Sequence, residues 1–349
     1  MKTKNTVPIV FTFDNNFFVA AMVTFHSMLR HAHENTFYDI FIMLDVEKFK
    51  AENKNDLARL ENDFSHKCKI TFIDMKNFGD GFAIQDPRFN FSVYYRLFIH
   101  NYIHIYDKVI FSDVDIIIVK DLNEIYQTDI SDYYLGAIKQ TKVNSLSPAR
   151  FKKYINKATD IKQGNYFNAG FLLMNLKKIR EGNFTEEFIK LSKVGFNNND
   201  QDILNHVFQN QVKYIGPKYC YIPAYSYFKK IDRSKFTEMF SPAEINEYEN
   251  DPAIIHYASM KPWNINKLEI TDLELEKYKL WWDEFNQGLT YINNKAVFDL
   301  FKKLNDNMIK IADDYNQKQT IPKTLKRLVA LTFRKLGLEN AVKSILSID

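Results

Sequence analysis

Two short apolar runs enclose a pair of aspartates in the stretch Val109-Ile110-Phe111-Ser112-Asp113-Val114-Asp115-Ile116-Ile117-Ile118-Val119. Both runs are rich in β-branched or aromatic residues and have the length of buried strands. Open α/β sheets bind their ligands at the carboxyl ends of the strands, which is where Asp113 stands relative to the first run. The stretch therefore predicts an α/β fold with a polar site at the edge of a sheet.

Similar apolar runs occur on both sides of this stretch, and in the first half of the chain they alternate with helical patterns such as Phe17 to Leu29. This alternation predicts βαβ units on a largely parallel sheet, and the less regular spacing in the second half predicts that the sheet is mixed. The expected strands are Val7 to Phe13, Ile40 to Leu44, Ile70 to Ile73, Val109 to Ser112, Ile116 to Val119, Leu135 to Ile138, Phe171 to Met174, Val212 to Ile215 and Ile254 to Tyr257.

The composition is that of a folded protein and excludes several classes of function. Of the 349 residues, 46% are hydrophobic and 26% are charged, and the net charge of +4 argues against a dedicated nucleic-acid-binding protein. Cys68 and Cys220 lack the spacing of a zinc site, and the chain contains no Gly-rich dinucleotide motif or P-loop. The apolar stretch Val7 to Phe13 is too short for a signal peptide or a membrane span, so we expect a cytoplasmic protein.

The character of the sequence changes after Trp263, where compact apolar runs give way to long charged patterns. We therefore expect a catalytic domain in residues 1–263 and a helical C-terminal extension in residues 264–349. Residues 322–349 combine an excess of lysine and arginine with apolar residues at helical spacing, which predicts a basic amphipathic helix. Such a helix either packs on the body of the protein or makes peripheral contact with the anionic inner face of a membrane.

The two aspartates and a distant histidine are candidate metal ligands. Asp113 and Asp115 point to the same side if their backbone is extended, and two adjacent carboxylates are costly to bury without a positive partner. His256, in the expected strand Ile254 to Tyr257, would complete a set of two oxygens and one nitrogen, which suits Mn²⁺ better than Mg²⁺. Lys261 would then neutralise a diphosphate. The alternatives are a surface turn, a structural histidine and a solvated lysine.

Three further polar clusters stand beside expected elements. Asn168-Ala169-Gly170 precedes an expected strand and forms either a ligand site or a tight turn. Asn199-Asp200-Gln201-Asp202 opens a helical pattern and either binds a ligand or caps the helix. Asp14-Asn15-Asn16-Phe17 follows the first strand, where polar side chains and an aromatic ring either recognise a base or begin a capped helix.

Together these motifs resemble those of the family 8 retaining glycosyltransferases, which include bacterial lipopolysaccharide galactosyl- and glucosyltransferases. Between Val7 and Trp263 the motifs occur in the family's order: Val-Phe-x-x-Asp-x-Asn, Tyr-Arg-Leu, Asp-x-Asp, Phe-Asn-Ala-Gly, Asp-Gln-Asp-x-Leu, and a histidine followed by Lys-Pro-Trp. The resemblance implies a Rossmann-like nucleotide-sugar domain of the GT-A type. It also implies UDP-glucose or UDP-galactose as donor and Mn²⁺ as cofactor, with Mg²⁺ as the alternative.

The resemblance assigns roles to residues at matching positions. Asp113, Asp115 and His256 would hold the cation, and Lys261 would contact the diphosphate. Thr12, Asp14, Asn16, Phe17 and the backbone of Val114 would bind the nucleoside, while Arg96, Asp113, Asn168, Ala169, Asp200 and Gln201 would surround the donor sugar.

The chain departs from the family's pattern at three places. Phe17 stands where tyrosine is frequent, and Thr12 stands where a smaller alanine is common. The segment from His256 to Lys261 is one residue shorter than usual and carries Ser259 in place of a glycine. These differences affect two expectations, the contact of Thr12 with the ribose and the way the loop around the diphosphate closes.

The implied reaction is transfer of a hexose, with retention of configuration, to a glycan, lipid-linked or protein-linked acceptor. Gln201 is a poor nucleophile, which favours attack from the leaving-group side, whereas Asp200 is the candidate for a covalent intermediate. For the whole chain, the alternatives are a nucleotide-sugar hydrolase or nucleotidyltransferase, and a non-catalytic sugar-binding or scaffold partner of another glycosyltransferase.

Overall fold

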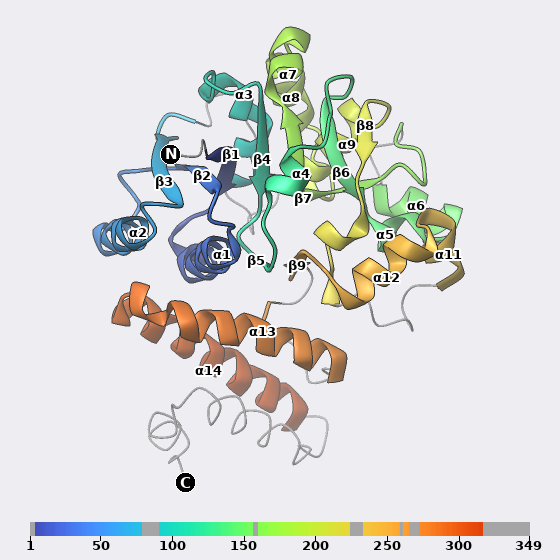
Figure 1. Cartoon of the computed structure of the whole chain (residues 1–349). Coiled ribbons are helices and arrows are strands. Elements are labelled where there is room, and N and C mark those ends of the chain that lie inside the picture. Colours follow the sequence, from blue (N-terminus) through green and yellow to red (C-terminus); the bar gives the residue numbers. More distant parts are fainter. Residues whose placement is uncertain are drawn as a thin grey trace.

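The computed structural model describes residues 4–78, 91–155, 160–223, 233–258, 261–264 and 272–316. Its centre is a seven-stranded sheet of order β3-β2-β1-β4-β7-β6-β8 (Figure 1). The strands are β1 (Asn5–Thr12), β2 (Thr36–Leu44), β3 (Cys68–Asp74), β4 (Lys108–Ser112), β6 (Leu135–Lys139), β7 (Phe167–Asn175) and β8 (Val212–Tyr214).

The sheet is mixed and mainly parallel, as the sequence predicts. β1 pairs in parallel with both β2 and β4, whereas β7 runs antiparallel to its neighbours β4 and β6. Val7, Ile9, Val10 and Phe11 of β1 are all fully buried. Strands covered on both faces are continuous apolar runs rather than alternating patterns, which is why these segments were recognisable in the sequence.

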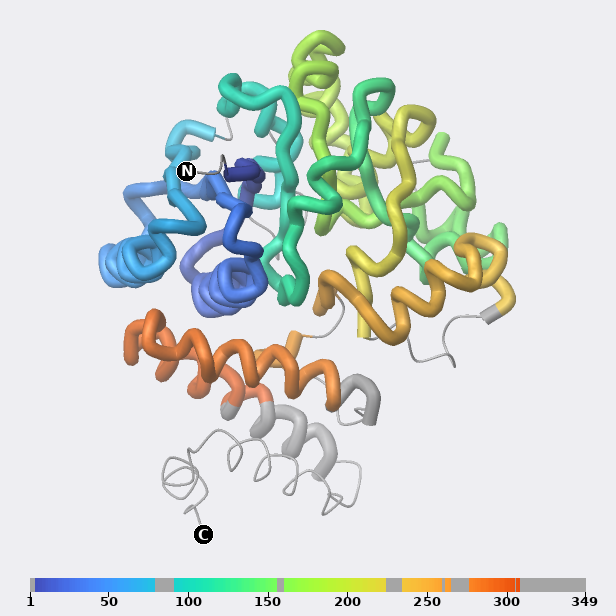
Figure 2. The backbone as a smooth tube through the Cα atoms, in the orientation of Figure 1, coloured from blue at the N-terminus to red at the C-terminus, as the bar shows by residue number. Residues whose placement is uncertain are grey.

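Helices cover both faces of the sheet, and α1 lies between the sheet and the C-terminal helices (Figures 1 and 2). The helices of the first half are η1 (Asn15–Phe17), α1 (Phe18–His31), α2 (Ala51–Asp63), η2 (Phe91–Phe98), α3 (Ile99–Tyr102), α4 (Asn123–Tyr126), α5 (Thr141–Asn144) and α6 (Pro148–Ile155). They are followed by α7 (Leu176–Gly182), α8 (Thr185–Ser192), α9 (Asn199–Phe208), η3 (Pro217–Tyr219), α11 (Arg233–Met239), α12 (Pro242–Asn250), α13 (Asp272–Gly288), η4 (Leu289–Tyr291) and α14 (Asn294–Asn316).

Two strands form a separate small sheet next to the carboxyl end of β4. β5 (Ile116–Ile118) pairs antiparallel with β9 (Ile254–His256), and the register places Ile116 opposite His256. The backbone N–H of Tyr257 also donates to the carbonyl of Asp115 at 2.8 Å. This pairing brings the distant histidine beside the second aspartate.

The C-terminal helices α13 and α14 pack on the body of the protein. Trp281 and Phe285 of α13 and Leu304 of α14 belong to the same buried cluster as Phe25 of α1. The domain boundary after residue 263 stays a prediction, and the expected basic helix in residues 322–349 lies outside the described residues. Within the described part of the chain, no helix has the length and apolar character needed to cross a membrane.

A buried ion pair ties α13 to α1. Glu284 is 5% exposed, contacts the guanidinium of Arg30 and lies 3.6 Å from Nδ1 of His26. Burial raises the pKa of Glu284, but the hydrogen bonds and charges of His26 and Arg30 lower it by a larger amount, so the pKa lies below its usual value. A carboxylate with a lowered pKa contributes stability above its unfolded-state pKa and loses this contribution as the pH falls through the folded-state value.

We expect Glu284→Gln to lower the free energy of unfolding by about 1 kcal/mol at neutral pH, because the change removes the buried negative charge that pairs with the half-exposed guanidinium of Arg30. Urea denaturation at neutral and acidic pH measures this effect, and the difference from the wild type should shrink in acid. Asp283→Asn, at the exposed neighbouring position, is the matched control. Equal stability of the Glu284→Gln and Asp283→Asn variants would contradict the prediction.

Candidate functional site

The two aspartates follow β4 in a bend that leads into β5. Residues 113–115 belong to no strand, so the two expected strands are separate and the extended backbone that would place both aspartates on one side is not formed. The bend is fixed at its start by the backbone N–H of Asp113, which donates to the carbonyl of Gly170 at 2.8 Å. The carboxylates nevertheless converge, because the antiparallel pairing of β5 presents a common partner to both of them.

That partner is His256. Its Nε2 atom lies 3.3 Å from Oδ1 of Asp115 and 3.8 Å from Oδ2 of Asp113. One ligand atom from each residue falls within 4.8 Å of the other two. On the other side of the ring, Nδ1 lies 3.6 Å from Sγ of Cys220, so Nε2 is the nitrogen that faces the carboxylates. The structure thus brings together the three metal ligands expected from the sequence.

Gly170 makes this convergence sterically possible. A Cβ atom at this position would lie 2.3 Å from Cε1 of His256 and 2.8 Å from Oδ2 of Asp113, closer than van der Waals contact allows. A side chain here would therefore fill the space between the candidate ligands. The set of two carboxylate oxygens and one imidazole nitrogen, with a glycine at its base, fits a divalent cation such as Mn²⁺.

Arg96, in the last turn of η2, connects the candidate metal ligand Asp113 to β7 and to Asp200. Its guanidinium donates to Asp113 Oδ1 and to the carbonyl of Ala169, both at 2.8 Å, and its Nε lies 2.9 Å from Oδ2 of Asp200. Its plane also lies over the ring of Phe111, with Cζ 4.3 Å from the centroid. Burial raises the pKa of Asp200 to about 6, although the charge of Arg96 opposes this shift.

Lys261 reaches the site from the segment after β9. Its ammonium contacts Oδ2 of Asp115. Burial lowers the pKa of Lys261 to about 8, and the charge of Asp113 partly offsets this effect. The lysine therefore carries its charge at neutral pH and lies beside the candidate metal ligands, as expected for a residue that contacts a diphosphate.

The Asn168-Ala169-Gly170 motif lies inside β7 and not before it, so both the later strand start and the tight-turn alternative are wrong. The strand extends to Phe167 because β6 pairs with Asn168 and Phe167 across a bulge at Ala137/Ile138. The side-chain oxygen of Asn168 accepts from the N–H of Gly170 at 2.8 Å.

Gln201 and Asp200 lie in the first turn of α9, as the sequence predicts, and Gln201 Oε1 accepts from the N–H of Ala169 at 3.0 Å. Asn205 was missed by the sequence analysis. It is fully buried, and its side chain binds both backbone groups of Phe167 at 2.8 and 2.9 Å and the carbonyl of Gln201 at 2.9 Å. The only signal was its spacing of four residues from Gln201, which places both on one helical face.

The residues expected to bind the nucleoside lie at the carboxyl end of β1 and in the following turn. Thr12 ends β1, and Asp14 caps η1 by accepting from the N–H of Asn16 at 2.8 Å, so this turn begins a capped helix, while base recognition by the same turn stays a prediction. The ring of Phe17 is 39% exposed and is accessible for stacking. The carbonyl of Val114 accepts from the hydroxyl of Thr24 at 2.8 Å.

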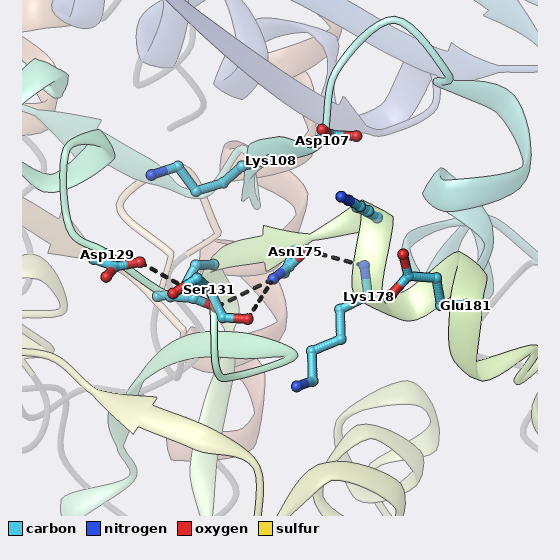
Figure 3. A pocket seen from close by; sticks show the side chains of 9 residues that line it. Asp107, Lys108, Asp129, Ser131, Asn175, Lys178 and Glu181 are labelled. Carbon is cyan, nitrogen blue, oxygen red and sulfur yellow. Dashed lines mark hydrogen bonds between the residues drawn. The ribbon is translucent and has the colours of Figure 1, made fainter.

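A cavity of about 430 Å³ lies elsewhere, at the opposite end of β4 and β7 (Figure 3). Asn175 at its centre donates to the carbonyls of Ile130 and Ser131 at 3.2 and 3.4 Å and accepts from the N–H of Lys178 at 3.0 Å. The cavity is lined by charged groups of both signs. None of the site residues expected from the sequence lines it.

Comparison with known proteins identifies the family. The model of glycosyl transferase family 8 matches residues 8–267, which span every residue of the site described above. The chain belongs to this family. An Escherichia coli lipopolysaccharide 1,2-glucosyltransferase is 26% identical over 273 residues, which cover 75% of this chain and 74% of the relative.

A Haemophilus influenzae protein assigned as a glycosyltransferase is 30% identical over 227 residues, which cover 62% of this chain. The match spans 64% of that relative, just under two thirds of its length. A solved structure of the galactosyltransferase LgtC, in complex with donor and acceptor sugar analogues, has 25% identity and a TM-score of 0.62 and covers 80% of this chain and 96% of LgtC.

The bifunctional glycosyltransferase WbbM, solved without ligands, has 24% identity and a TM-score of 0.65, and the match covers 87% of this chain and 52% of WbbM. The likeness to LgtC and WbbM confirms the GT-A-type fold that the family 8 resemblance implies.

Proposed function

We propose that this family 8 chain transfers a hexose, glucose or galactose, from a UDP-sugar to a glycan, lipid-linked or protein-linked acceptor, with retention of configuration. The observation that supports this most directly is the convergence of Asp113, Asp115 and His256 beside Lys261, next to the polar pocket around Arg96. The activities of two relatives, a glucosyltransferase and a galactosyltransferase, agree with both choices of hexose.

Different residues of the site bind different parts of the donor. Asp113, Asp115 and His256 hold Mn²⁺, or Mg²⁺ as the alternative, which when bound offsets negative charge on the departing diphosphate. Lys261 contacts the same diphosphate. The nucleoside is bound by Thr12, Asp14, Asn16, Phe17 and Val114, and the sugar is surrounded by Arg96, Asp113, Asn168, Ala169, Asp200 and Gln201.

In the reaction, the bond between the anomeric carbon and the diphosphate oxygen breaks and a bond to the acceptor oxygen forms. The acceptor hydroxyl gives its proton to the departing diphosphate oxygen, so no base from the protein is needed. The ion pair of Asp200 with Arg96, at 2.9 Å, supports this attack from the leaving-group side, because the paired positive charge lowers the nucleophilicity of the carboxylate. Positive charge fixed before the reaction stabilises the leaving group without reorganisation.

The cellular setting is also part of the proposal. We place the protein in the cytoplasm, with peripheral contact to the inner face of the membrane through the basic residues 322–349. Lipopolysaccharide or another surface polysaccharide is the pathway that the relatives suggest.

A donor screen followed by product analysis tests the function. We expect UDP-glucose or UDP-galactose to raise the thermal midpoint of unfolding more when Mn²⁺ is present than when it is absent, and a glycan acceptor to gain the mass of one hexose. Release of UDP without any acceptor gaining mass would favour a hydrolase instead. Two results together would favour the scaffold alternative. They are that no UDP-sugar stabilises the protein, and that cellular glycans are unchanged when the Asp115→Ala variant replaces the wild type.

The lowered pKa of Lys261 predicts how metal-free UDP binding depends on pH. The ammonium is charged below its pKa of about 8 and is neutral above it. Because the bound diphosphate favours the charged form, we expect the dissociation constant of UDP to rise about tenfold between pH 7 and pH 9. Calorimetry on the wild type and on Lys261→Gln measures this, since the variant should lose the dependence. The same pH dependence in both proteins would exclude Lys261 as the group responsible.

A further inference from the structure

A continuous chain of hydrogen bonds runs through the site between two backbone N–H groups. At one end, the N–H of Asn198 donates to Oδ2 of Asp202 at 2.9 Å. Asp202 Oδ1 accepts from the hydroxyl of Tyr166, whose oxygen accepts from Nε2 of Gln201 at 2.9 Å. At the other end, Gln201 Oε1 accepts from the N–H of Ala169 at 3.0 Å.

We propose that Tyr166 and Asp202 are positioning residues that fix which end of the Gln201 amide faces β7. The inference deepens the proposed hexose transfer and rests on it for its catalytic consequence. A glutamine amide has a donating and an accepting end that sterics alone do not distinguish. Here the neighbours decide the orientation, because an ionised carboxylate accepts only and therefore takes the single proton of the Tyr166 hydroxyl.

The direction in which each hydrogen bond of this row is donated follows from the groups at its two ends. A backbone N–H cannot be reversed, so both ends of the chain are donors. A row of hydrogen bonds between two fixed donors needs one member that accepts from both sides, and the Asp202 carboxylate is that member. Once the proton of Tyr166 points to Asp202, the phenolic oxygen has only acceptor capacity left for Gln201. The NH₂ group of Gln201 must then face Tyr166, and its carbonyl oxygen must face Ala169.

The surroundings hold these groups in a solvent-free environment. Tyr166 and Asp202 are fully buried, so water does not compete for their hydrogen bonds. Burial raises the pKa of Tyr166 well above its usual value, so the hydroxyl keeps its proton. The side chain of Asn198 also donates to both oxygens of Asp202, at 3.1 and 3.2 Å. Burial raises the pKa of Asp202, and the three donor groups from Tyr166 and Asn198 oppose this shift by stabilising the ionised carboxylate.

The consequence for the reaction is that Gln201 presents an oxygen to the pocket beside Arg96 and Asp113. One lone pair of this oxygen is used by Ala169, and the other remains for the donor sugar. An acceptor oxygen stabilises positive charge that develops at the anomeric carbon, whereas the NH₂ end of the amide would oppose it. Fixing the orientation before the substrate arrives removes the need to reorganise it during transfer.

The Asp202→Asn variant tests the donor and acceptor order along this row of hydrogen bonds. The N–H of Asn198 still requires an acceptor, so the new amide must place its oxygen there and its NH₂ toward Tyr166. The Tyr166 proton then turns to Gln201, and the Gln201 amide reverses and points its NH₂ at the N–H of Ala169. We expect about tenfold lower kcat with an unchanged dissociation constant for UDP, because Gln201 acts on the sugar and not on the nucleotide.

Tyr166→Phe removes the link without changing the buried volume much and should lower kcat by a similar factor. In a Gln201→Ala background, Tyr166→Phe should have no further effect, because Tyr166 acts only through Gln201. Tyr126→Phe is the matched control, since it removes a part-buried tyrosine hydroxyl that donates to the carbonyl of Lys108 at 3.1 Å, at the opposite end of β4 from the site. An equal loss of kcat from Tyr166→Phe in both backgrounds would overturn the proposal.

A crystal structure of the Asp202→Asn variant decides the geometry without any turnover. We expect the Gln201 side chain to move out of hydrogen-bonding distance from the N–H of Ala169. A Gln201 amide that stays at about 3.0 Å from this N–H, as in the wild type, would overturn the positioning role. Failure of the wild type to use any UDP-hexose would refute the proposed function alone, because the crystallographic result does not depend on it.

Discussion

An Asp115→Asn variant is expected to lose divalent-cation binding and to transfer hexose at least about 10³-fold more slowly than the wild type. Asp115 is the more deeply buried of the two aspartates and contacts both His256 and Lys261. An amide of the same shape retains the packing but removes the charge that holds a cation and balances Lys261. Calorimetric titration with Mn²⁺ and steady-state rates with a UDP-hexose measure the two losses separately.

The control for this variant is Asp132→Asn, which removes an exposed carboxylate outside the site. It should bind Mn²⁺ and turn over like the wild type, which excludes an effect of net charge alone. A thermal midpoint near that of the wild type would show that the Asp115→Asn protein is folded. Wild-type affinity for Mn²⁺ in this folded variant would refute the assignment of Asp115 as a ligand.

A large loss of Mn²⁺ affinity is also expected when a single methyl group is added at Gly170. In Gly170→Ala, the new Cβ would lie 2.3 Å from Cε1 of His256 and 2.8 Å from Oδ2 of Asp113. The imidazole has little room to yield, because β9 is paired with β5 and Nδ1 faces Cys220. We therefore expect the affinity for Mn²⁺ to fall about 10²-fold, with a stability loss of about 1–3 kcal/mol from overpacking.

Gly216→Ala provides a matched control, because a Cβ at Gly216 would meet no atom within 4 Å and its φ of −59° suits any residue. Both variants add the same methyl group, so a difference in Mn²⁺ affinity measures the space at the ligands. Equal affinities in the two proteins would mean that the ligand triad tolerates a side chain at position 170. Anomalous scattering from crystals soaked in Mn²⁺ would then locate the cation directly.

Much of the sheet was predictable because its strands are buried on both faces. Runs such as Val7 to Phe13 and Ile40 to Leu44 stand out from their polar surroundings, and the observed strands β1 and β2 include most of each run. The antiparallel insertion of β7 between β4 and β6 was not predictable, because it depends on contacts between distant segments. For the same reason, the extension of β7 to Phe167 across a bulge was missed.

The site was predictable in its residue types but not in its geometry. Asp113, Asp115 and His256 were recognised as possible ligands, yet β5 and β9 contain only three residues each, and their register carries no sequence signal. Asn205 and Cys220, which orient other site residues, belong to types that are frequent in structural positions. Only the folded chain distinguishes such supporting side chains from ordinary buried ones.

The pairing of β9 with β5 also governs when the protein becomes competent during its biogenesis. A chain that emerges from the ribosome exposes both aspartates early, whereas the imidazole that completes their ligand set follows only after most of the sheet has been synthesised. Binding of the proposed cation would therefore be a late event, and a nascent or truncated polypeptide lacking the β9 segment would not assemble the candidate ligand set.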